Sequence, residues 1–198
     1  MQDNLARVRE YYTYEDYLTW NSDSRYELVD GLPHAMSAPT PRHQEICGDI
    51  YIALREHLNG RQCKVYQDIN VRLFPQRQRN KQMVFRPDLS VICDQDKLDN
   101  NGCNGAPDLI IEVLSPGNQR HDRYFKFNQY YRAGVREYWI VDPENQLVQV
   151  CLLEENRYYI MMYHAQDNLP CTVLPGLNFV LSSIFPTEET PTEDDPIG

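Results

Sequence analysis

Two carboxylates inside apolar, strand-like runs constrain this chain more than any other feature. Asp88 lies in the run from Pro87 to Ile92, and Glu112 lies in the run from Asp108 to Ser115. A carboxylate in an apolar strand is costly unless a partner pairs with it or it coordinates a cation. Two such strands, joined by one connection, can lie side by side and direct both carboxylates at one point. Mg²⁺ selects oxygen ligands of this kind, so the pattern predicts a metal site.

The length and composition are those of a single globular domain. The chain has 198 residues, of which 41% are hydrophobic and 24% charged, which suits one domain with a full core. Its apolar runs are too short to span a membrane, and its polar N-terminus is unlike a secretory signal. We expect a cytoplasmic protein with one domain over residues 1–186 and a flexible, acidic, proline-rich tail over residues 187–198.

Charge is unevenly distributed along the chain. The formal net charge is −10, and the tail holds five of the acidic residues. The segment 69–87 has no acidic residue, and its basic residues predict contacts to a nucleic-acid backbone. The residues expected to make these contacts are Arg72, Arg77, Arg79 and Lys81. A solvated loop is the alternative interpretation.

The six cysteines give no zinc-binding pattern. They occupy positions 47, 63, 93, 103, 151 and 171, and no two are closer than ten residues. The sequence therefore predicts reduced cysteines, most of them buried as small hydrophobic residues.

Hydrophobic periodicity predicts an α/β (α+β) fold with a mixed sheet and a helix on each side of it. We expect helices over 14–20, over 43–58, and over about a dozen residues that end before Gly134. We expect strands over 25–29, 33–38, 63–74, 84–93, 108–114, 137–141, 147–153, 158–164 and, irregularly, 170–181. Turn residues predict a hairpin at Asp30-Gly31, and a surface loop over 94–106.

Four stretches resemble a large bacterial family of restriction endonucleases, abundant in cyanobacteria, within the PD-(D/E)XK nuclease superfamily. These stretches are Arg25–Gly31, Arg86–Leu89, Pro107–Pro116 and Lys126–Pro143. The similarity runs in order from about residue 12 to 185. It implies a restriction-endonuclease-like fold with additional β-hairpins, and Mg²⁺-dependent cleavage of DNA, with Mn²⁺ as a substitute metal. It also implies a homodimer, because duplex cleavage needs two sites.

The resemblance also implies roles for individual residues. Asp88 and Glu112 match the metal-binding acids, and the carbonyl of Val113 would be a further ligand. A typical nuclease of the PD-(D/E)XK superfamily carries a lysine two residues after the second acid, where this chain has Leu114. Lys126, on the following helix, matches that lysine in a relocated position. Glu27 matches a recurrent acid, which could be a third ligand, a base for water, or a hairpin residue that pairs with arginine.

Other interpretations remain open at the level of sequence. The acidic net charge and the missing strand lysine also fit an inactive nuclease-fold protein that binds nucleic acid or protein. A hydrolase of small phosphoesters would need a deep pocket in place of an open groove. His43 is expected to be a solvated or capping residue at a helix start, and Asp108 to have a structural role at a strand end.

Overall fold

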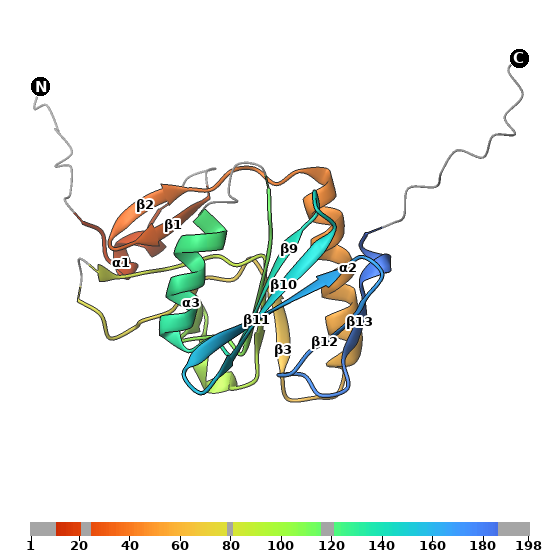
Figure 1. Cartoon of the computed structure of the whole chain (residues 1–198). Coiled ribbons are helices and arrows are strands. Elements are labelled where there is room, and N and C mark those ends of the chain that lie inside the picture. The colour runs from red at the N-terminus through yellow and green to blue at the C-terminus, as the bar shows by residue number, and fades with distance from the viewer. Residues whose placement is uncertain (1–10, 21–24, 79–80, 116–120, 186–198) are drawn as a thin grey trace, which may run out of the picture.

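A six-stranded mixed sheet forms the centre of the molecule (Figure 1). The computed structural model describes residues 11–20, 25–78, 81–115 and 121–185, without the side chains of 121–123. The strand order is β11-β10-β9-β8-β5-β3, in which β8 and β9 are parallel and the other neighbours antiparallel. The strands are β3 (Lys64–Gln67), β5 (Leu89–Ile92), β8 (Leu109–Val113), β9 (Glu137–Asp142), β10 (Leu147–Glu154) and β11 (Arg157–His164). The predicted mixed sheet, with the Glu112 strand near its middle, is confirmed.

One helix covers each face of this sheet (Figure 1). Helix α2 (Pro41–His57) packs on one face, and α3 (Phe127–Ala133), preceded by the π-helical turn His121–Lys126, packs on the other. Helix α2 begins two residues before the predicted start. The Thr40 side chain accepts a hydrogen bond from the His43 N–H, and Pro41 suits the first helical position because its missing N–H would be unpaired there anyway.

Strand β8 is buried on both faces, which explains its continuous apolar sequence. Side chains alternate along a strand. Leu109, Ile111 and Val113 therefore join the core beneath α2. Ile110 and Leu114 join the core beneath α3, together with Tyr130. Glu112 belongs to this second set by alternation, so its carboxylate lies on the α3 side of the sheet.

The N-terminal segment forms a separate small layer beside α3 (Figure 1). Helix α1 (Tyr14–Leu18) is capped by Thr13, and the hairpin of β1 (Tyr26–Val29) and β2 (Leu32–Ala35) follows. Asp30 and Gly31 both have positive φ angles, 47° and 78°, as the predicted two-residue hairpin turn requires. Leu28 exchanges backbone hydrogen bonds with Val84 and thereby attaches the hairpin to the chain that leads into β5.

Three predicted elements differ from the structure. The expected loop over 94–106 contains a short helix, Gln95–Lys97, and a hairpin of β6 (Leu98–Asp99) and β7 (Gly102–Asn104), which pairs with β4 (Val71–Arg72). The Asp99 carboxylate accepts hydrogen bonds from two backbone N–H groups and closes the turn. The expected strand over 63–74 is interrupted at Asp68, which has a φ of 51°. The expected strand over 84–93 becomes part of the central sheet only at Leu89.

The C-terminal part agrees with the prediction. β10 and β11 form the expected hairpin, and β12 (Asn168–Pro170), β13 (Asn178–Val180) and a helical turn, Leu181–Ser183, form the irregular end. The tail over 187–198 lies outside the described residues. Within the described ranges, no helix has both the length and the apolar character needed to cross a membrane.

The prediction of reduced cysteines is wrong for one pair. Cys63 and Cys93 form a disulfide, whereas the four others are buried free thiols. The register of β3 with β5 aligns Lys64 with Ile92. Cys63 therefore faces Cys93 across two antiparallel chains, and only this strand pairing brings the two together.

Gly102 provides a test of the small sheet. Its φ is 143°, and an added Cβ would lie 2.2 Å from the carbonyl oxygen of Asn70. Gly102→Ala should therefore lower the free energy of unfolding by roughly 2–4 kcal/mol, measured by urea denaturation. Gly48→Ala in α2 is the control. Nothing lies within 4 Å of an added Cβ there, and alanine should raise stability by about 0.5–1 kcal/mol. Equal effects at the two positions would contradict this account.

Candidate functional site

A buried ammonium group held between two carboxylates lies on the α3 side of the sheet. Lys126 Nζ is 3.0 Å from Glu27 Oε1 and 2.9 Å from Glu112 Oε1. All three residues are less than 5% exposed. The groups come from the β1 hairpin, from β8 and from the end of the π-helical turn before α3. Folding thus brings together three residues that the sequence singled out as catalytic candidates.

Tyr130 supports Glu112 from the same helical segment as Lys126. Tyr130 follows Lys126 by four positions, so the two side chains lie on one face of the helix. The Tyr130 hydroxyl donates a hydrogen bond of 2.7 Å to Glu112 Oε1. Burial, followed by the charges of Glu112 and Glu27, holds the pKa of Tyr130 well above its ordinary value. The phenol therefore remains a hydrogen-bond donor at neutral pH.

Glu27 has two partners in this cluster. Besides Lys126, its Oε1 accepts a hydrogen bond of 3.0 Å from the backbone N–H of Arg86. The Arg86 guanidinium itself pairs with Asp68.

Asp88 lies where the chain enters β5. Its Oδ2 accepts hydrogen bonds from the Val113 N–H, at 2.8 Å, and from His43 Nε2, at 3.1 Å. Strand β5 begins at the next residue, Leu89, which pairs with Ile111. Because Asp88 accepts a hydrogen bond from Val113, the residue after Glu112, the two acids lie at the same end of the sheet.

His43 is the residue that sequence reasoning underestimated. It is 8% exposed, which contradicts the expectation of a solvated histidine. Burial lowers the pKa of its imidazole, but the hydrogen bond and charge of Asp88 outweigh burial and raise it overall. The signal was present in the sequence, because His43 precedes Ile46, Cys47 and Ile50 at the spacing of the buried helical face.

Cys47 lies one helical turn beyond His43. Its Sγ is 3.6 Å from His43 Nδ1. Burial, followed by the charges of Asp88 and Glu112, raises the pKa of the thiol. Both carboxylates are thus close enough to Cys47 to act on it electrostatically, and the thiol stays protonated at neutral pH.

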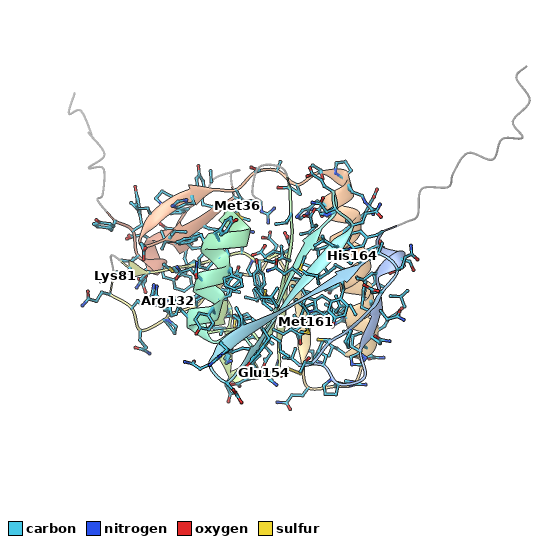
Figure 2. The ribbon with its side chains drawn as sticks, in the orientation of Figure 1. Met36, Lys81, Arg132, Glu154, Met161 and His164 are labelled. Carbon is cyan, nitrogen blue, oxygen red and sulfur yellow. A yellow bond between two sulfur atoms is a disulfide. The ribbon has the colours of Figure 1, made fainter. Side chains whose placement is uncertain are left out.

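The basic residues expected to contact nucleic acid are dispersed. Arg72 lies over the Tyr14 ring and donates to the Pro75 carbonyl, and Arg77 lies over the Phe74 ring. Lys81 is exposed and extends from the edge of the molecule (Figure 2). The fourth residue, Arg79, lies outside the described residues. Burial, followed by the charge of Arg132 on α3, lowers the pKa of Arg77. The segment that contains Arg77 and helix α3 therefore both contribute positive charge to the same side of the molecule.

A pocket of about 250 Å³ lies beside the N-terminal layer and not at the carboxylates. It is lined by Tyr17, Leu18, Trp20, Tyr26, Asp68, Asn70 and Arg86. This pocket does not include the site residues, so it gives no support to a hydrolase of small phosphoesters.

Asp108 has the expected structural role. Its Oδ2 accepts a hydrogen bond from the Cys93 N–H, and its Oδ1 lies 3.2 Å from Arg136. It ties the ends of β5, β8 and β9 together at the opposite end from Asp88.

Lys126 offers a direct test of the buried cluster. Lys126→Met removes the ammonium and leaves Glu27 and Glu112 buried without it, which should lower the free energy of unfolding by roughly 3–5 kcal/mol. Lys64→Met is the control, since within the described part of the chain the Lys64 ammonium makes just one, exposed, hydrogen bond, to the Arg61 carbonyl. This variant should change stability by less than about 1 kcal/mol. Denaturant unfolding at pH 7.5 measures both, and a Lys126→Met variant as stable as the control would contradict the cluster's role.

Comparisons with known proteins identify the family of this chain. A protein of Synechocystis sp., described as uncharacterized, is 29% identical over 178 residues, covering 86% of this chain and 90% of that protein. The crystal structure of a "putative nuclease belonging to DUF820" from Anabaena variabilis superposes with a TM-score of 0.71 at 18% identity. It covers 87% of this chain and 97% of that one, and it shows the fold. The model of the Uma2 family, described as "Putative restriction endonuclease", matches residues 10–182. The chain therefore belongs to the Uma2 family.

Proposed function

We propose that the protein is a Mg²⁺-dependent endonuclease that cleaves DNA phosphodiester bonds, with Mn²⁺ as an alternative metal. One observation carries the proposal: the Asp88 carboxylate binds the backbone of Val113, directly after Glu112, whose own carboxylate contacts the buried ammonium of Lys126. Family membership supports the same class of activity.

The donor set fits a divalent cation. Asp88 engages its two hydrogen-bond donors through Oδ2 alone, and among the described residues Oδ1 has no partner. Asp88 is also the least buried of the three acids, with a side chain 16% exposed, so a cation has access from solvent. Asp88, Glu112 and the carbonyl of Val113 would hold the ion, which would polarise the scissile phosphate and activate a water molecule.

Lys126 and Glu27 have complementary roles in this proposal. The Lys126 ammonium would stabilise the negative charge that develops on the phosphate. Glu27 would orient that ammonium, since it is itself fixed by the backbone N–H of Arg86. This positioning role was not among those that the sequence suggested for Glu27, and it agrees with these contacts.

DNA would lie along the basic side of the molecule. Arg72, Arg77, Arg79 and Lys81 would hold the backbone, and such contacts position DNA without reading its sequence. A symmetric homodimer acting in the cytoplasm would bring two such sites to one duplex. The exposed side chains of Tyr159, Ile160 and Met162 on the edge strand β11 are candidates for its interface.

A second candidate function is a nuclease-fold module that binds without cleaving. The two ion pairs of Lys126 favour it, because an ammonium already shared by two carboxylates has less charge to offer a phosphate. The net charge of −10 favours it as well.

Nicking of supercoiled plasmid in the presence of Mg²⁺ separates the two functions. Asp88→Asn and Glu112→Gln should each lower the cleavage rate by at least about 100-fold while circular dichroism shows an unchanged fold. Asp96→Asn changes an exposed acid just after β5 and should retain full activity. Equal cleavage by all variants would refute the assignment, and binding of DNA without cleavage by the parent protein would establish the binding module.

Lys81 tests the basic surface independently. Lys81→Ala should weaken binding of a short DNA duplex and reduce the slope of log K against log salt by about 1, because one phosphate contact is lost. Lys64→Ala, on the far edge strand β3, should leave the slope unchanged. Fluorescence anisotropy in Ca²⁺, which would prevent turnover, measures both variants. Identical slopes would place the DNA elsewhere.

A further inference from the structure

Three different ligand types converge where α2 begins. A nitrogen of His43, the sulfur of Cys47 and a carboxylate oxygen of Asp88 all lie within 4.8 Å of one another. His43 and Cys47 are buried, and Asp88 is half-buried. Neither the family description nor the relatives assign a role to His43.

The geometry at His43 suits a shared ion. The separation of 3.1 Å between His43 Nε2 and Asp88 Oδ2 equals that of two adjacent ligands on an octahedral cation, about 3 Å for bonds of about 2.1 Å. A cation between these atoms would replace the hydrogen bond without a large movement of either side chain.

Cys47 determines which imidazole nitrogen is available. Its Sγ contacts Nδ1 of His43, and a ligating histidine generally uses its second ring nitrogen in a hydrogen bond that fixes the ring. With Nδ1 engaged at Cys47, Nε2 is the nitrogen directed at Asp88. The helix holds this arrangement rigidly, because Thr40 caps its first turn and Ile46 and Ile50 anchor it to the sheet.

We propose that His43 Nε2 is a ligand of the metal ion, so that the site selects a first-row transition-metal ion such as Mn²⁺ over Mg²⁺. This inference rests on the metal site of the proposed function, but not on cleavage of DNA. An imidazole nitrogen favours transition metals, whereas Mg²⁺ prefers an all-oxygen set. The mixed nitrogen and oxygen set thus distinguishes this site from one made by the carboxylates alone.

Calorimetric titration of the metals into the DNA-free protein tests the selectivity. His43→Gln should lower the affinity for Mn²⁺ by about tenfold or more, and the affinity for Mg²⁺ by no more than about twofold. His57→Gln, at the other end of α2, is the matched control and should leave both affinities unchanged. Asp88→Asn should abolish binding of both metals. An unchanged ratio of Mn²⁺ to Mg²⁺ affinity in His43→Gln overturns the inference.

A spectroscopic measurement on the parent protein makes the test independent of how well the variants fold. Electron spin-echo modulation of bound Mn²⁺ should contain a coupled nitrogen, and the modulation should change when histidine is labelled with ¹⁵N. A histidine that only orients Asp88 through a hydrogen bond would give no directly coordinated nitrogen. Absence of this coupling overturns the inference even if His43→Gln weakens binding.

The outcomes also separate this inference from the proposed function. Mn²⁺ coordination through His43 without any plasmid cleavage would sustain the metal site and refute the endonuclease. Cleavage with Mg²⁺ and no nitrogen coupling would sustain the endonuclease and refute the role of His43. Failure of the parent protein to bind either metal would refute both.

Discussion

The structure around the site depends on one buried ammonium group. Lys126 reaches two carboxylates from different layers, Glu27 of the β1 hairpin and Glu112 of the central strand β8. Burying three charges is expensive, and their mutual attraction offsets this cost only where geometry is good and further hydrogen bonds are made. Tyr130 and the Arg86 backbone supply such bonds. The N-terminal layer is therefore attached to the sheet by a polar contact, while the apolar cluster around Leu28 packs it against Val84, in the chain that leads into β5.

A second contact positions Asp88. The Val113 N–H and the imidazole of His43 hold the same oxygen, so β8 and α2 both restrain the carboxylate. The two groups of contacts meet because Asp88 binds the backbone of Val113, the residue that follows Glu112 on β8. The buried ammonium lies on one side of this pair and the imidazole on the other. In the proposed reaction the cation would lie between the carboxylates of Asp88 and Glu112. Contacts from both faces of the sheet already hold these two carboxylates in place.

Much of this arrangement could be predicted from local pattern. The continuous apolar run around Glu112 indicates a central strand buried on both faces. The stripe of Ile46, Ile50 and Leu54 indicates the long helix, because a helix buried on one face requires this spacing. The Asp30-Gly31 turn is specified by its need for positive φ. The hairpin of β6 and β7 was missed because its composition is that of a loop. Its pairing with β4 is a contact between segments distant in sequence, and so it leaves no local pattern.

By itself, the sequence determined which residue types would be buried and at which spacing. That spacing predicts the sheet and the helices that cover it. The sequence also identified the three acids and the one lysine that are candidates for the site. Only the tertiary structure decided their partners: that Lys126 lies between Glu27 and Glu112, that His43 faces Asp88, and that Cys63 meets Cys93. The physical reason is that a local pattern depends on neighbouring residues, whereas a tertiary contact joins segments distant in the sequence. Periodicity reports the environment of one segment, whereas a distance between segments depends on strand register and helix packing, which the whole chain sets together.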